Sequence, residues 1–176
     1  MAFVINGRAG MNLDRVTAGT TTDGQNAEFK LGTTVTASDG QECVYVQAGA
    51  AISTTTNQPF ALGIDENYQA TKLTKANAVA GYMVAFAPQQ IISDNDFFWA
   101  IKKGSNFKIK VGASCAADVQ LYTTATAGVL DDTSGGSHVP ILGLAIITAA
   151  SASASAGSTV RYAIAFNPVG KPQGTV

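Results

Sequence analysis

The sequence predicts an all-β protein that folds as a single compact β-barrel or β-sandwich, with an extended arm before it and a short extended tail after it. Residues 107–111 and 160–166 alternate in side-chain type with a period of two, which places successive side chains on opposite faces of a strand. Gly, Pro, Asp, Asn and Ser separate the other short apolar runs and favour turns between them. A helix is plausible only over residues 71–80, where Thr, Asn and Val limit it to a turn or two.

The 176 residues fit one domain, and we place its boundaries by composition. Residues 1–24 form the predicted arm, residues 25–168 the barrel or sandwich, and residues 169–176 the tail. The arm is rich in Gly and Thr, and the residues that we expect it to dock with are Phe3, Val4, Ile5, Arg8 and Arg15, of which the two arginines suggest an acidic neighbour. A frayed terminus is the alternative interpretation of the same composition.

The first part of the domain contains a predicted hairpin. Ser38-Asp39-Gly40 separates a Thr- and Val-rich run from residues 43–46, and Asp-Gly between such runs is a strong hairpin signal. Short strands are expected next at residues 60–64 and 82–86, and Pro88 closes the second of them.

The stretch from Asp94 to Asp132 is the predicted centre of the fold. It holds the single tryptophan, Trp99, and three apolar runs separated by Lys-Gly-Ser, Gly-Ala-Ser and a Thr-Ala-Thr-Ala-Gly segment. We therefore expect short strands with turns between them. Residues 141–147 follow as a continuous apolar run of the buried-strand type, and Pro168 is expected to end the last strand.

A weak internal echo is present along the chain. Leu62-Gly63-Ile64 with the residues before it is similar to Leu142-Gly143-Leu144 with the residues before that. Two related hairpin units that close into one barrel or sandwich would explain the echo. Chance similarity between Gly-, Ala- and Thr-rich strands would explain it equally well.

The composition favours an assembled protein. Only 13% of the residues are charged, about half of the usual fraction in soluble domains. Large faces with little charge are normal inside oligomers, so we expect self-association, although a neutral free surface remains the alternative. The net charge of -1 provides no basic field for nucleic acid. The start of the chain has no signal-peptide or membrane-span pattern, so we expect synthesis in a cytoplasm and no membrane partner.

No motif predicts catalysis, a cofactor or a metal. His138 is the only histidine and sits in a Gly-rich connection, a poor place to orient a base. Cys43 and Cys115 lack zinc-site spacing and are expected as free buried thiols, with a disulfide as the alternative. The paired acids, including Asp131-Asp132, are explained by turn formation, although such pairs also suit calcium. The residues expected in the core or at a subunit interface are Trp99, Tyr122, Tyr162 and Phe166.

One family resemblance accompanies these observations. Trp99, Ile101 and Gly104, then the run AADVQLYTTATAGVLD from Ala116 to Asp131, and later Leu142-Gly143-Leu144-Ala145, resemble small virion structural proteins of tailed phages. Head decoration, or cement, proteins are the most similar kind. The resemblance extends over residues 28–166 and consists of a pattern of small residues.

The resemblance implies a β-tulip-like or barrel domain that binds the outer surface of a phage capsid and stabilises the shell. It implies the major capsid protein as partner, a homotrimer, a location on the virion and no enzymatic activity, with the arm adding a strand to the capsid protein. A small-molecule ligand is not expected. The alternatives are a tail, fibre or head-tail connector subunit, or a virion-surface carbohydrate-binding module that uses Trp99 and Tyr122 as a sugar platform.

Overall fold

The computed structural model describes residues 12–19, 27–135, 138–150 and 159–170, and its regular structure is nearly all β, with 44% strand and 4% helix. The predicted all-β barrel is therefore confirmed. The elements in chain order are β1 (Thr34–Thr36), β2 (Glu42–Ala48), β3 (Ala61–Ile64), β4 (Gln69–Lys72), α1 (Lys75–Val79), β5 (Met83–Phe86), β6 (Phe97–Val111), β7 (Leu121–Thr123), β8 (Leu130–Asp131), β9 (Pro140–Ile146) and β10 (Thr159–Gly170).

Five of these strands close a barrel, which we call the first ring. β2 pairs with β4 in parallel, and the other pairings around the ring, β4–β3, β3–β5, β5–β6 and β6–β2, are antiparallel. Closure matters because a closed sheet leaves fewer strand edges open for unwanted pairing. The ring uses the first part of β6, where Phe97 to Lys103 lie opposite β2.

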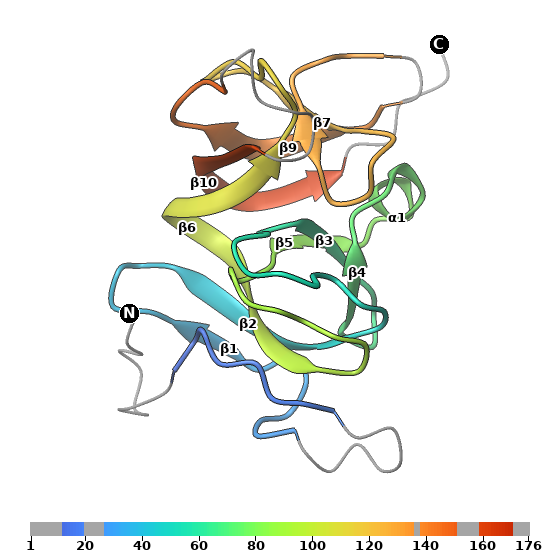
Figure 1. Cartoon of the computed structure of the whole chain (residues 1–176), viewed down its shortest axis with the longest axis vertical. Coiled ribbons are helices and arrows are strands. Elements are labelled where there is room, and N and C mark those ends of the chain that lie inside the picture. Colours follow the sequence, from blue (N-terminus) through green and yellow to red (C-terminus); the bar gives the residue numbers. More distant parts are fainter. Residues whose placement is uncertain (1–11, 20–26, 136–137, 151–158, 171–176) are drawn as a thin grey trace.

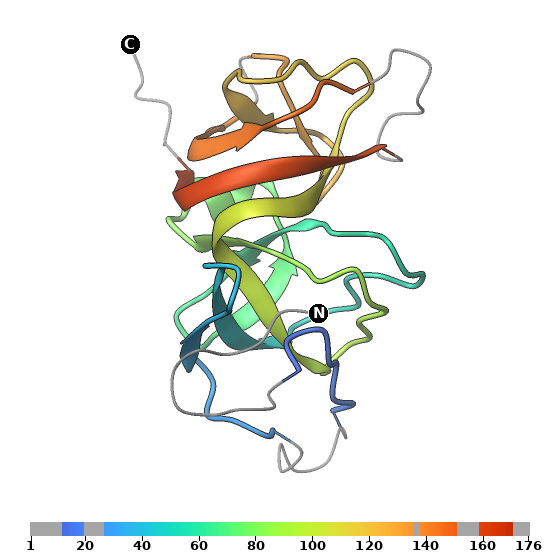
Figure 2. The same cartoon turned by 90° about the vertical axis from the view of Figure 1, so that its left-hand side faces the viewer.

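A second ring closes on the other part of the same strand. β6 pairs with β8 in parallel, and β8–β7, β7–β9, β9–β10 and β10–β6 are antiparallel. β10 lies opposite β6 from Gly104 to Val111. Figure 1 shows β6 running from the lower half of the molecule, with β1 to β5, into the upper half, with β7, β9 and β10. Figure 2 shows the same division from the side.

The two rings repeat one topology. We count the five strands of each ring in chain order, β2 to β6 in the first ring and β6 to β10 in the second. In each ring, the first strand is parallel to the third and antiparallel to the fifth, and the second strand lies between the third and the fourth. The register aligns Val46-Gln47-Ala48-Gly49 with Ile109-Lys110-Val111-Gly112. Each Gly in this alignment donates its N–H to the third strand, Gly49 to Ala70 and Gly112 to Leu130.

The interiors of the rings follow the same alignment. Equivalent positions are buried in both rings, as alternation along paired strands requires. Written first ring and then second ring, they are Val44 and Phe107, Val46 and Ile109, Ala48 and Val111, Ile52 and Cys115, Leu62 and Leu121, Ala70 and Leu130, Ala85 and Ile141, and Ala100 and Ala163. The structure thus contains a repeat of two related units, but the predicted echo of Leu62-Gly63-Ile64 in Leu142-Gly143-Leu144 was wrong, because Leu62 corresponds to Leu121.

The Lys-Gly-Ser segment at residues 103–105 does not form the predicted turn. β6 continues through it and changes partner there, from β2 to β10. Gly104 has φ 144°, where a side chain would be strained, and Asn106 has φ 61° beside the register shift with β10. These residues bend the strand instead of ending it, so one strand can serve both rings.

Other boundaries agree with the sequence or differ for local reasons. The hairpin at Asp39 is confirmed as the β1–β2 connection, with Ala37 N donating to Gln41 O at 2.7 Å. α1 is the single short helix that residues 71–80 predict, and a capping box between Thr74 and Asn77 starts it. β10 does not end at Pro168, because Val169 pairs with Met83 of β5, so the strand extends two residues into the predicted tail, to Gly170.

Candidate functional site

A segment before the first strand covers one outer face of the first ring. Thr17 and Phe97 exchange backbone hydrogen bonds, each of 2.8 Å, and Leu13 is buried beside them. The Phe29 ring lies 5.2 Å from the Trp99 ring and 5.3 Å from the Tyr45 ring. Trp99 is only 2% exposed as a result, so it belongs to the core and is closed to a sugar ring.

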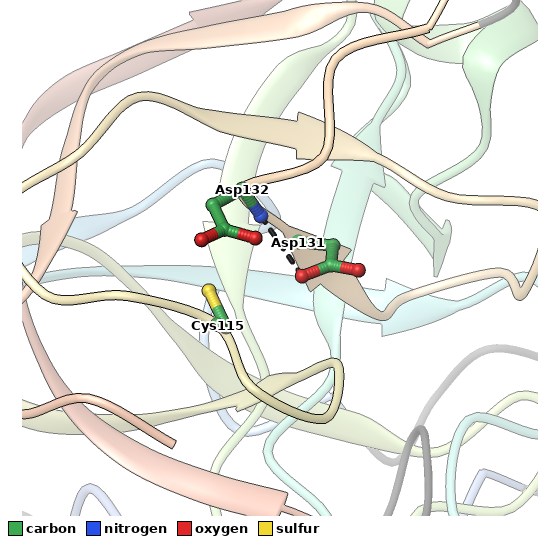
Figure 3. Close-up of side chains that lie close together, drawn as sticks. All are labelled: Cys115, Asp131 and Asp132. Carbon is green, nitrogen blue, oxygen red and sulfur yellow. Dashed lines mark hydrogen bonds between the residues drawn. The ribbon is translucent and has the colours of Figure 1, made fainter. Parts of the chain in front are cut away.

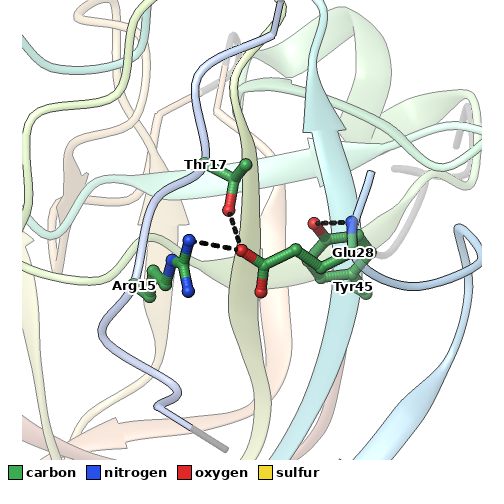
Figure 4. A network of polar contacts seen from close by, with 4 residues as sticks. All are labelled: Arg15, Thr17, Glu28 and Tyr45. Atoms are coloured by element: carbon green, nitrogen blue, oxygen red, sulfur yellow. Dashed lines mark hydrogen bonds and ion pairs between the residues drawn. The ribbon is translucent and has the colours of Figure 1, made fainter. Parts of the chain in front are cut away.

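A polar network fastens the same segment, as Figure 4 shows. Glu28 Oε1 lies 2.8 Å from the Arg15 guanidinium and accepts a 3.0 Å hydrogen bond from the Thr17 hydroxyl. The Glu28 N–H donates to the Tyr45 hydroxyl at 3.2 Å, and burial raises the pKa of Tyr45. The acidic neighbour of Arg15 is thus Glu28 of its own chain, whereas Phe3, Val4, Ile5 and Arg8 lie outside the described residues.

The corresponding outer face of the second ring is bare within the described part of the chain. Tyr162 is 43% exposed and Phe166 is 63% exposed, while the alternate residues Ala163 and Ala165 point inward and are fully buried. Ile147 of the residues after β9 is also exposed and donates its N–H to Tyr162 O. We call Ile147, Tyr162 and Phe166 the bare face.

The strand register shows that the two faces are equivalent. Tyr45 of β2 lies opposite Trp99 of β6, and at the same place in the second ring Lys108 of β6 lies opposite Tyr162 of β10. The Lys108 ammonium sits 5.7 Å from the centre of the Tyr162 ring, within the range of a cation–π contact. The sequence patterns showed both strands but gave no sign of which aromatic residue the arm would cover.

Tyr122, the fourth predicted interface residue, lies elsewhere. It is half-buried on β7, opposite Asp131 and Pro140, whereas Trp99 is in the part of β6 that pairs with β2. The two residues therefore do not form the sugar platform considered from the sequence.

Two grooves open at the surface. One, of about 400 Å³, is lined by residues of both faces, among them Leu13 and Trp99 of the covered face and Tyr162 of the bare face with Phe107 and Lys108. The other, of about 550 Å³, is lined by two tyrosines and two carboxylates together with four smaller or apolar residues: Ile64, Asp65, Glu66, Tyr68, Ala80, Gly81, Tyr82 and Met83. Sequence patterns did not indicate this second groove, because its residues come from two separate segments of the chain, 64–68 and 80–83.

Figure 3 shows a cluster that sequence reasoning also missed, Cys115 beside Asp131 and Asp132. Their ligand-type atoms lie within 4.8 Å of one another. The Asp132 carboxylate accepts from Ala116 N at 2.8 Å, and Asp131 accepts from Asp132 N at 2.9 Å. Burial, and then the nearby carboxylates, raise the pKa of the Cys115 thiol to about 11, so the thiol stays protonated at neutral pH. The Asp132–Ala116 hydrogen bond joins the loop after β6 to the end of β8.

His138 occupies a half-buried position in the connection before β9. Its Nδ1 lies 3.0 Å from the Thr133 carbonyl oxygen, which can only accept, so Nδ1 carries the hydrogen. Cys43 and Cys115 are both free thiols, as the sequence predicts.

No protein-family model, curated protein or solved structure matches this chain. Across the described residues, no helix has the length and apolar character needed to span a membrane.

Proposed function

We propose that this chain is a non-enzymatic structural protein of a tailed-phage virion, which binds the outer surface of the capsid and stabilises the shell. Its partners are the major capsid protein and further copies of the chain, assembled as a homotrimer. It is made in the host cytoplasm and ends on the virion surface. The resemblance of residues 28–166 to head decoration proteins and the low content of charged residues, 13%, support this proposal.

The bare face carries the proposal. Ile147, Tyr162 and Phe166 expose apolar side chains together on one side of the second ring. Aromatic residues are enriched in protein interfaces, and grouped apolar side chains on a soluble protein indicate a surface that another molecule covers. Capsid attachment uses many such contacts at once, so each can be weak while the whole coat holds.

The arm has two parts with different roles. Residues 12–19 are built into the first ring through Leu13 and Thr17, so they support the fold. Phe3, Val4, Ile5 and Arg8 remain the residues that we propose for contact with the capsid. A deletion that tests this role therefore ends at residue 11, because deleting residues 1–24 would also uncover Phe97.

The test is co-sedimentation of the purified chain with phage heads that lack it. Saturation at a fixed number of copies per capsid subunit is the expected result, and deletion of residues 1–11 should lower the affinity while the circular dichroism spectrum stays unchanged. Absence of binding, with a stable free oligomer, would overturn capsid decoration in favour of a tail, fibre or connector subunit.

A glycan-binding module on the virion surface is the second candidate, and the groove with Tyr68 and Tyr82 favours it. Aromatic rings pack against the apolar faces of sugars, and the carboxylates of Asp65 and Glu66 can accept from hydroxyl groups. Loss of oligosaccharide binding in Tyr82→Ala, with capsid attachment unchanged, is the result that supports this function. An oligosaccharide panel without any binder removes it.

A further inference from the structure

We propose that the groove of about 550 Å³ binds sugars that carry a free amino group, with the ammonium at the carboxylates of Asp65 and Glu66 and the sugar ring against Tyr68 and Tyr82. This inference rests on the glycan-binding function proposed for the groove and names the class of sugar. It is independent of the capsid-binding function of the chain.

The groove lies where two turns meet at one end of the β3–β5 ladder. Ile64 at the end of β3 is opposite Met83 at the start of β5, so the turn after β3 and the turn before β5 are neighbours. Backbone hydrogen bonds hold both turns, because Tyr68 N donates to Asp65 O at 3.1 Å and Tyr82 N donates to a carbonyl oxygen of α1 at 3.1 Å. The backbone on both sides is thus in place before a ligand arrives, which lowers the entropic cost of binding.

The two tyrosines provide the apolar surface that a sugar ring needs. Tyr68 and Tyr82 are both half-buried and both line the groove. The Tyr68 ring packs directly on Gly32, since a Cβ at that glycine would lie 2.4 Å from Tyr68 Cζ. Aromatic rings held in this way pack against the apolar face of a sugar and also attract a cation near the ring face.

The charge of the groove selects a cationic sugar. Asp65 and Glu66 line it without any Lys, Arg or His among the lining residues. Asp65 Oδ1 accepts from Asn67 N at 2.9 Å and from Gln69 N at 2.8 Å, whereas Asp65 Oδ2 and the Glu66 carboxylate have no hydrogen bond or ion pair within the described chain. Two carboxylates on adjacent residues repel each other, and an ammonium relieves this repulsion where a neutral hydroxyl does not.

The same arrangement discriminates against other sugars. An acidic sugar brings a further negative charge to the two carboxylates, so the groove repels it. A neutral sugar leaves the repulsion between the carboxylates in place. N-acetylation of an amino sugar removes the cation and keeps the ring, so the acetylated form is the matched probe for charge.

The experiment measures binding of the full chain to oligosaccharides of glucosamine, N-acetylglucosamine and glucose that share length and linkage. Isothermal titration calorimetry in mildly acidic buffer keeps the glucosamine amines protonated. We expect the glucosamine oligomer to bind about fivefold or more tightly than the other two, since two partly exposed ion pairs add modestly to affinity. Higher salt should reduce this preference, because ions screen exposed charges.

Matched variants locate the preference in the groove. Glu66→Gln should lose most of the preference for glucosamine. Asp94→Asn, which removes an exposed carboxylate that does not line the groove, should keep it. Tyr82→Ala should weaken binding of the glucosamine oligomer while the circular dichroism spectrum stays unchanged.

Each outcome decides a different question. Absence of binding by all three oligosaccharides overturns the glycan-binding function itself. Equal binding of the three keeps that function and overturns the selection of amino sugars. A preference that survives in Glu66→Gln overturns the groove as its site. Equally tight binding of spermidine, a polyamine without a sugar ring, overturns the sugar as the occupant, because charge alone would then explain the affinity.

Discussion

The same outer position is covered in one ring and bare in the other. Trp99 lies under Phe29 and the arm and is 2% exposed, whereas Tyr162, its equivalent, is 43% exposed beside Lys108. The ring topology is common to both, so topology does not decide the burial of this position. An additional segment before β2 decides it, and within the described residues the second ring has no such segment, because its chain enters through β6.

The largest expected difference between the two faces is in stability. Trp99→Ala should lower the free energy of unfolding by about 3–5 kcal/mol, because it leaves a cavity under the arm. Tyr162→Ala should lower it by less than about 1 kcal/mol, because the side chain already contacts solvent. Urea unfolding followed by circular dichroism measures both without the tryptophan signal. Equal losses would mean that the bare face is covered inside the free chain.

Equivalent glycines provide a second, smaller contrast. A Cβ on Gly112 would lie 2.7 Å from the carboxyl carbon of Asp131, which its own hydrogen bonds hold in place. A Cβ on Gly49 would lie 3.1 Å from the end of the flexible Gln69 side chain. Gly112→Ala should therefore cost about 1–3 kcal/mol, and Gly49→Ala should stay within about 0.5 kcal/mol of the wild type. Thermal unfolding of the two variants checks the order, and the reverse order would contradict the tighter packing at Gly112.

The two thiols make the rings differ in alkaline solution. Burial is the main cause that raises the pKa of Cys43 to about 12 and that of Cys115 to about 11, against 9.0 for both in an unfolded chain. Above pH 9 the unfolded chain loses these protons while the folded chain keeps them, so the free energy of unfolding falls as the pH rises. Each thiol contributes a slope of up to about 1.4 kcal/mol per pH unit.

Variants separate the two contributions. Urea titrations between pH 8 and 11 should give a flatter decline for Cys43→Ala and for Cys115→Ala than for the wild type. The Cys43 contribution should continue to higher pH, because its folded pKa is the higher one. A decline of the same steepness in all three proteins would contradict the burial of the thiols.

The smallest effect concerns the ion pair on the covered face. The Arg15 side chain is 62% exposed and that of Glu28 is 34% exposed, so water and salt screen their attraction. A double-mutant cycle with Arg15→Ala and Glu28→Gln should give a coupling of about 0.2–1 kcal/mol that shrinks at high salt. A larger, salt-independent coupling would show that charge, rather than Leu13 and Phe29, holds the arm.

Local sequence patterns were enough to predict most of the strands. The alternation over residues 160–166 and the Asp39-Gly40 turn depend on neighbours in the sequence, and the structure has the strand and the hairpin they predict. The burial of residues 141–147 was overestimated, since Ile147 and Leu142 are exposed. A continuous apolar run looks the same in a sequence whether its second face is covered or free.

The candidate site depended on distant contacts and was less predictable. The sequence around Gly104 predicts a turn. β6 nevertheless stays extended, because the residues before Gly104 pair with β2 and those from Gly104 onward pair with β10. The burial of Trp99 requires the arm to fold back, and the meeting of Cys115 with Asp131 requires β8 to lie beside β6. None of these contacts leaves a periodic signal along the chain.

The sharing of β6 also sets an order of assembly during synthesis. The strand pairings that close the first ring use no residue beyond Lys103, so they can form while the rest of the chain is still being made, although Val129 joins the core of this ring later. The remainder of β6 then continues from the paired strands of the first ring. The second ring grows on that strand, and β10, the last strand to emerge, closes it against β6. One continuous strand thus makes the first half of the protein the folding template for the second.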